Sequence, residues 1–131
     1  MSRIRSKGTT PERLIFSELR KLGIRYSKHI KVFGTPDIAF KAEKLAVFID
    51  GDFWHGYNWK VLGQKPKSDF WRKKISRNIK RDTAVDKQLH SIGWKTMRIW
   101  EHEVLKDPAP SAKRIMHRLN RLRPLVRVEL P

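Results

Sequence analysis

The sequence predicts an α/β fold in which helices flank a mixed β-sheet. Its 131 residues are the length of one domain, and 39% of them are hydrophobic, which is enough for a single core. Helical spacing of apolar residues alternates with short buried runs in the order helix, strands, long helix, strand, helix. We find no repeats and no linker between domains, so we expect residues 1–131 to form one domain.

The first helix is predicted to begin at Thr10, after a basic N-terminal arm over residues 1–9. A threonine cap, Pro11 at the first helical position and the acidic Glu12 in the first turn are typical of a helix start. Gly23 is expected to end this helix. The extended segments expected after it are 24–27, 31–33, 37–40 and the buried run 44–50.

The second half of the chain begins with a predicted irregular loop over 51–67, which is rich in glycine. A long helix is predicted over 68–91 and a strand over 94–100. The inner face of that helix is expected to carry Trp71, Ile75, Ile79, Val85 and Leu89. Ser111 is expected to cap the last helix, which with a tail makes up residues 106–131.

The chain is strongly basic, with 30 Lys and Arg against 13 Asp and Glu and a formal net charge of +17. Such a surplus is typical of proteins that bind nucleic acid, and a ribosomal or generally adhesive basic protein is the alternative. For the basic residues of the predicted long helix, a solvated helix face is the simpler explanation, but the density of cations there disfavours it. The cations that we expect to contact DNA are Arg3, Arg5, Lys7, Arg72, Lys73, Lys74, Arg77 and Arg81.

The absence of cysteine excludes disulfides, thiolate catalysis and cysteine-bound zinc. No apolar run approaches the ~18 residues of a membrane span, and no signal-peptide pattern opens the chain. We therefore expect a soluble, cytoplasmic protein whose partner is a polyanion and not a membrane.

Two acidic residues bracket the predicted strand pair. Asp37 precedes one strand and Asp50 ends the other, so a hairpin would bring both carboxylates to one end of the sheet. Neighbouring carboxylates repel each other unless a cation lies between them, which suggests a Mg²⁺ site of the kind that phosphodiester hydrolysis uses. The spacing alone leaves an alternative equally open, in which each aspartate only caps a turn or loop.

Two further polar residues, His55 and Glu12, are candidate site residues only if the fold brings them close to the two aspartates. His55 follows closely after Asp50, and an imidazole beside a metal-bound phosphate can move a proton, although a single loop histidine is more often structural. Glu12 is an ordinary acid at a helix start unless the first helix lays its N-terminus on the same site.

Aromatic side chains accompany the acids. Phe53 and Trp54 lie in the glycine-bounded loop, and Trp71 lies near the start of the basic helix. In a phosphate-cutting protein such rings stack on bases or wedge between base pairs. The alternative is that they plug the end of the sheet.

Five blocks of the sequence together resemble the very short patch repair (Vsr) endonucleases. The likeness covers about residues 1–105, with the same order and similar spacing. The blocks are Pro11-Glu12, Pro36-Asp37, FIDGDFWHG (Phe48 to Gly56), Phe70-Trp71 and the run from Gly93-Trp94 to Trp100-Glu101. This resemblance implies a restriction-endonuclease-like core of the PD-(D/E)xK type and Mg²⁺-dependent nicking of DNA beside a T:G mismatch, with Mn²⁺ as the alternative ion.

The resemblance also implies roles for single residues. Asp37 matches the metal-binding aspartate, His55 the catalytic histidine and Glu12 an assisting acid. The backbone carbonyl at Ile49 matches a further metal contact. The residues that match the aromatics wedged into the duplex are Phe53, Trp54 and Trp71.

The sequence departs from that family's pattern in three respects, the third of which is a change in the loop detail on which mismatch recognition depends. Where well-known members bind a structural zinc, it has Asp52, Tyr57, Trp59 and His102, so we expect no structural zinc and a loop held by packing through Tyr57 and Trp59. Asp50 stands where those enzymes have a histidine, and Ile49 replaces a threonine. Asp50 is therefore expected to be a second metal ligand and one of the catalytic residues.

These departures leave substrate choice open while favouring the cleavage chemistry. A Vsr-like homing or restriction-associated endonuclease would cut matched double-stranded DNA, and a non-catalytic DNA-binding module would cut none. A monomer would suit a nick and a dimer a double-strand cut, and the sequence does not decide between them.

Overall fold

The computed structural model describes residues 10–28, 34–53 and 55–128. The predicted arm over 1–9, with Arg3, Arg5 and Lys7, lies outside these residues. So do the predicted strand at 31–33 and the side chain of Trp54.

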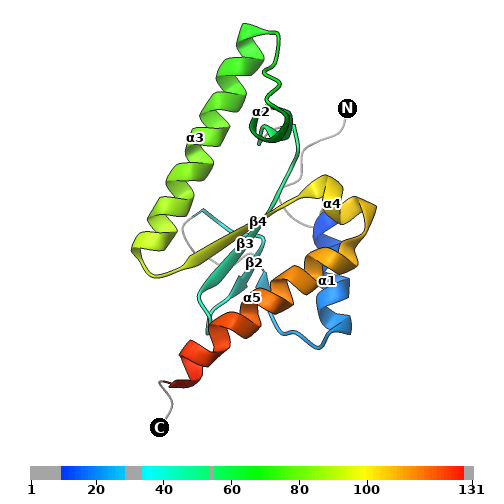
Figure 1. The fold of residues 1–131 in the computed structure, drawn as a ribbon, viewed down its shortest axis with the longest axis vertical. Coiled ribbons are helices and arrows are strands. Elements are labelled where there is room, and N and C mark those ends of the chain that lie inside the picture. Colours follow the sequence, from blue (N-terminus) through cyan, green and yellow to red (C-terminus); the bar gives the residue numbers. More distant parts are fainter. Residues whose placement is uncertain (1–9, 29–33, 54, 129–131) are drawn as a thin grey trace.

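Four neighbouring strands form one mixed sheet (Figure 1). They are β1 (Ser27–Lys28), β2 (Ile38–Phe40), β3 (Leu45–Asp50) and β4 (Lys95–Trp100), adjacent in that order. The β1–β2 and β2–β3 pairs are antiparallel, whereas β3 and β4 are parallel. The predicted hairpin and the mixed sheet are therefore confirmed.

Helices cover both faces of the sheet, as predicted. In Figure 1, α1 (Thr10–Lys21), α4 (Glu101–Lys106) and α5 (Pro108–Val128) gather on one side. Their buried residues form the larger core with the strands, and they include Ile15, Leu19, Val104, Ile115 and Leu119. On the other face, Leu89 of α3 (Asp69–Ser91) packs against Ala46 and Phe48.

The predicted long helix is confirmed, and the Ser68 side chain caps it by accepting a hydrogen bond from the Trp71 N–H. The expected loop over 51–67 is wrong in part, because α2 (Tyr57–Leu62) lies within it. Tyr, Asn and Trp are weak helix formers, so local propensity gave no signal. Two glycines with φ near +70°, Gly56 and Gly63, flank α2 and allow the chain to enter and leave it.

The start of the last helix also differs from the expectation. Helix α5 begins at Pro108, and Ser111 is buried in its first turn instead of capping it. The Asp107 side chain accepts a hydrogen bond from the Ala109 N–H (3.2 Å), so an Asp-Pro pair forms this helix start. The short helix α4, which buries Val104, was not predicted.

The sheet sets the position of the site. Asp50 and Trp100 pair at the carboxyl ends of the parallel strands β3 and β4, and the chain leaves β3 there through a loop that leads to α2. In Figure 1 the first half of α3 extends beyond the sheet together with α2. Across the described parts of the chain, helices are too short or too polar to cross a membrane.

Candidate active site

Asp37 is held at the end of the β2–β3 hairpin by backbone contacts. Its N–H donates to the carbonyl of Val47 (3.0 Å), and its Oδ2 accepts a hydrogen bond from the Ile49 N–H (2.7 Å). The antiparallel register, with Ile38 opposite Val47, places Asp37 directly beside the last residues of β3.

Glu12 reaches Asp37 from another element. It lies in the first turn of α1, is only 3% exposed, and its side chain is hydrogen-bonded to the Asp37 carboxyl. Burial, with the Glu12 side chain and the charge of Asp50 acting in the same direction, raises the pKa of Asp37 to about 7 despite the opposing hydrogen bond from Ile49. The end of α1 therefore does lie on the site, which is the condition under which Glu12 matters.

Asp50 shares this site but has a cationic partner. The Arg98 guanidinium donates through Nη1 to both Asp50 oxygens (2.9 and 3.2 Å) and through Nη2 to Asp86 (2.9 Å), and it stacks 4.3 Å from the Phe48 ring centroid. Burial raises the pKa of Asp50, and the Arg98 charge opposes that effect. We had named neither Arg98 nor Asp86 from the sequence.

His55 is oriented by a carboxylate that the sequence reasoning also missed. Its Nδ1 lies 2.6 Å from Asp82 Oδ2 and 3.8 Å from Asp50 Oδ1. Burial disfavours the charged imidazole, but the Asp82 hydrogen bond and the Asp50 charge outweigh it and raise the pKa of His55. One sequence signal pointed to Asp82: it follows Ile75 and Ile79 at helical spacing, so an acid lies on the apolar face of a basic helix.

These groups line one cavity of about 420 Å³. Its wall includes Asp37, Asp50, His55 and Asp82, and Arg81 contributes a cation. The ligand atoms of Asp50, His55 and Asp82 lie within 4.8 Å of one another, so these three residues could hold a metal ion. Carboxylate oxygens are the donors that Mg²⁺ prefers, and a divalent cation would offset the charges of Glu12 and Asp50 that, together with burial, raise the Asp37 pKa.

The aromatic residues form an exposed cluster at the start of α3. Trp71 makes edge-on contacts with Phe53 (5.2 Å between centroids) and with Phe70 (4.9 Å). Phe53 is 51% exposed and Phe70 is 63% exposed, so this cluster does not plug the sheet. Phe70 belongs to it, although we had not assigned it a role from the sequence.

The basic residues of α3 face more than one direction. Arg72, Lys73 and Arg77 line a hollow together with Trp59 of α2, whereas Arg81 lines the acidic cavity. Lys74 is exposed on the same helix.

The residues at the positions associated with zinc in the resembling enzymes lie partly together. His102 Nδ1 lies 2.9 Å from Asp52 Oδ1, and the Tyr57 ring packs edge-on against both His102 (4.5 Å) and Trp100 (5.1 Å). Trp59 does not join them and instead lies under Lys65, 5.7 Å from its Nζ. A hydrogen bond and ring packing thus tie the loop after β3 to α4.

Comparisons with known proteins identify the family of the chain. The family model described as DNA mismatch endonuclease Vsr matches residues 1–61. The chain is 48% identical over 107 residues to the Type II nicking enzyme V.HpaIIP of Haemophilus parainfluenzae. These residues cover 79% of this chain and 76% of the relative. It is 41% identical over 125 residues to the Type II nicking enzyme V.NaeI of Lentzea aerocolonigenes (88% and 73% covered).

A more distant relative carries the family name itself. The DNA mismatch endonuclease Vsr of Escherichia coli K12 is 29% identical over 105 residues, which cover 77% of this chain and 66% of the relative. The mixed sheet with helices on both faces is the restriction-endonuclease-like core that the resemblance implied. The chain therefore belongs to the Vsr family of DNA endonucleases.

Proposed function

We propose that this endonuclease uses Mg²⁺ to hydrolyse one strand of duplex DNA beside a T:G mismatch. The observation that supports it most strongly is the cavity in which the Asp37 and Asp50 carboxylates face the His55–Asp82 pair. A protein that only bound DNA would gain nothing from buried carboxylates next to phosphate, because like charges repel.

The acidic groups fit a divalent cation. Asp37 has a pKa raised to about 7 by burial and by its acidic neighbours Glu12 and Asp50, which is the expected condition of carboxylates whose cation is absent. We assign the metal to Asp37 and Asp50, with the backbone carbonyl of Ile49 as a third contact. We do not assign it to the Asp50–His55–Asp82 group, because His55 and Asp82 are hydrogen-bonded to each other. When bound, Mg²⁺ would polarise the phosphate and lower the pKa of the attacking water.

The protein's own groups supply proton transfer and orientation. Because the Asp82 carboxylate can only accept, we assign the His55 proton to Nδ1, which leaves Nε2 as the nitrogen able to take a proton from water. Glu12 shares a hydrogen bond with Asp37 and orients it. Arg98 fixes Asp50 through Nη1 while both carboxylate oxygens keep further lone pairs.

Two sets of residues support a DNA duplex as the substrate. The basic side chains Arg72, Lys73 and Arg77 on α3 suit phosphate contacts. Phe53 and Trp71, together with Trp54, would wedge beside the mismatch. The relatives' names support cutting of a single strand, which a monomer can perform, and we expect the enzyme to act in the cytoplasm.

The test is cleavage of matched and T:G-mismatched duplexes with each strand labelled separately. We expect Mg²⁺-dependent cutting of one strand of the mismatched duplex only. Cutting of both strands of matched DNA would replace the proposal with a homing or restriction-associated endonuclease. Binding without cutting of either duplex would indicate a DNA-binding module.

A further inference from the structure

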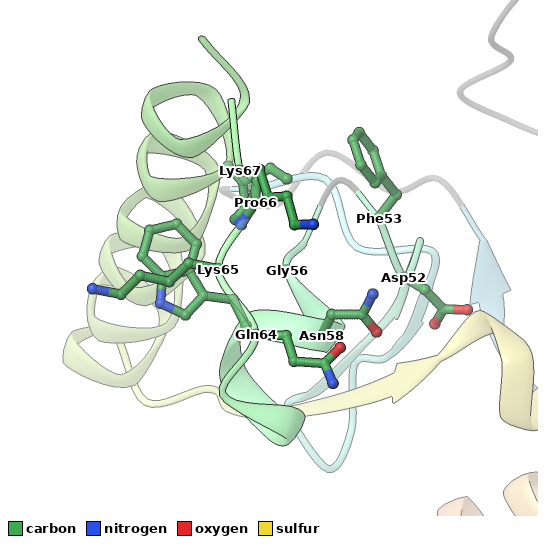
Figure 2. A pocket seen from close by; sticks show the side chains of 10 residues that line it. Asp52, Phe53, Gly56, Asn58, Gln64, Lys65, Pro66 and Lys67 are labelled. Carbon is green, nitrogen blue, oxygen red and sulfur yellow. The ribbon is translucent and has the colours of Figure 1, made fainter. Parts of the chain in front are cut away.

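A second cavity, larger than the acidic one, lies beside the loop that carries His55. Its volume is about 560 Å³, it shares no lining residue with the acidic cavity, and Figure 2 shows it from close by. Gly56 and Ile75 lie in its wall, and a Cβ at Gly56 would come within 3.0 Å of Ile75. Because Gly56 follows His55 directly, the two cavities adjoin through the backbone.

Two amide side chains converge on this cavity. The Gln64 N–H donates to the carbonyl of Asn58 (2.9 Å), so the two side chains leave neighbouring points of the backbone, and Figure 2 shows both amides on the same side of the cavity. Within the described residues, neither amide has a hydrogen-bond partner. Each amide offers donors and an acceptor together, the pattern that pairs with the edge of a nucleobase.

Aromatic and basic side chains complete the wall. Trp59 and Phe53 supply flat apolar surface, and Lys65 and Lys67 supply charge. The Arg72 guanidinium donates to the carbonyls of both Pro66 and Lys67 (2.9 Å each), so the wall that carries the lysines is anchored to α3. An apolar cavity with a few directed polar groups is typical of a small-ligand site.

A strongly basic hollow adjoins the cavity. It lies along α3 and is lined by Arg72, Lys73, Arg77 and Lys80, and Trp59 lines both the hollow and the cavity. A DNA strand whose phosphates lay in this hollow would therefore have its bases beside Trp59. The exposed Phe53, which lines the cavity and contacts Trp71, lies where a wedge would unstack such a base.

From this arrangement we infer that the cavity bounded by Phe53, Asn58, Trp59 and Gln64 receives one nucleobase unstacked from the bound DNA. Trp59 and Phe53 would stack on the base, and the two amides would bind its edge. The inference rests on the proposed function, since it requires that the chain bind DNA.

The test compares two duplexes that differ only in one base. Both carry a single extra nucleotide in one strand, which is thymidine in the first duplex and an abasic nucleotide in the second. Binding is measured by fluorescence anisotropy without added Mg²⁺, so no strand is cut. We expect the wild-type chain to bind the first duplex about tenfold or more tightly than the second, because the base adds stacking and hydrogen bonds.

Paired variants locate the effect. The double variant Asn58→Ala, Gln64→Ala should bring the ratio of the two dissociation constants close to one. The control is Gln88→Ala, because Gln88 is an exposed amide of α3 that does not line the cavity. This control should leave the ratio unchanged. Because the readout is a ratio, a general loss of affinity does not mimic the effect.

The outcomes separate this inference from the function on which it rests. A wild-type ratio close to one, or a high ratio that survives loss of both amides, would overturn the nucleobase cavity while DNA binding and nicking stand. Failure of the wild-type chain to bind either duplex would overturn the proposed function as well.

Discussion

His55 and Asp82 are 27 positions apart in the sequence, and their side chains are joined by a contact of 2.6 Å between Nδ1 and Oδ2. The first lies in the loop after β3 and the second in the middle of α3, so the packing of that helix on the sheet sets the orientation of the imidazole. Such a pair fixes the tautomer of a histidine that transfers protons.

Replacing Asp82 tests this role. We expect Asp82→Asn to lower the nicking rate by ~10-fold or more and to move the acidic limb of the rate profile to lower pH. The direction follows because Asp82 raises the pKa of His55, so its loss lets the imidazole lose its proton at lower pH. Asp107→Asn, at an exposed aspartate outside the proposed DNA contacts, is the control and should leave rate and profile unchanged. An Asp82→Asn profile that coincides with wild type would contradict the assignment.

Arg98 is expected to be essential to stability because three aspartates depend on it. It contacts Asp50 and Asp86 directly and lies 3.8 Å from Asp82. Loss of one partner from a buried ion pair is strongly destabilising, so Arg98→Ala should lower the free energy of unfolding by ~3–5 kcal/mol. Arg123→Ala, which breaks the peripheral pair with Glu43, should cost less than ~1 kcal/mol. Urea unfolding of both variants measures the difference, and equal losses would be inconsistent with a buried Arg98 network.

Asp37 should make the stability of the metal-free protein depend on pH. Its pKa is raised from 3.8 to about 7 in the folded chain, so the unfolded chain binds fewer protons between these values. The stability that Asp37 contributes is therefore fully present below pH ~4 and is lost as the pH rises through about 7. Asp37→Asn removes this loss and should stabilise the metal-free protein at pH 8 by up to ~4 kcal/mol. Thermal unfolding at pH 5 and pH 8 checks it, and an Asn variant less stable than wild type at pH 8 would argue against the raised pKa.

The loop after β3 should hold its position without a metal ion. Asp52 pairs with His102, and Tyr57 packs on His102 and Trp100. At constant Mg²⁺, dialysis against a zinc-selective chelator should therefore leave the melting temperature unchanged. Tyr57→Leu should destabilise the protein by ~1–2 kcal/mol, because it removes two ring contacts. A fall in melting temperature on chelation would show that a bound ion contributes to this loop.

The sequence was sufficient to predict the positions of residues whose partners lie nearby in the chain. Asp37 and Asp50 follow from one hairpin, and the start of α1 follows from the run Thr10-Pro11-Glu12. The residues that shift the pKa values of these acids are distant in the sequence. Arg98, for example, lies 48 residues from Asp50. Alternation in β4 predicts a strand, but it does not predict which buried acid an arginine on that strand will meet.

The site also depends on an element that local propensity could not reveal. Helix α2 forms between two glycines from residues that favour helices weakly, and its packing near α3 creates the amide-lined cavity. Glu12 was a candidate only through resemblance, because nothing local indicates that the start of α1 reaches the end of β3.

The most direct test of the account is the single-turnover nicking rate of wild type and Asp37→Asn on a T:G-mismatched duplex in Mg²⁺, with DNA affinity measured on the same samples. We expect Asp37→Asn to bind the duplex with an affinity within about threefold of wild type, because Asp37 makes no cationic contact with phosphate, and to produce no nicked strand. Nicking by Asp37→Asn at the wild-type rate would contradict the assignment of the acidic cavity as the active site.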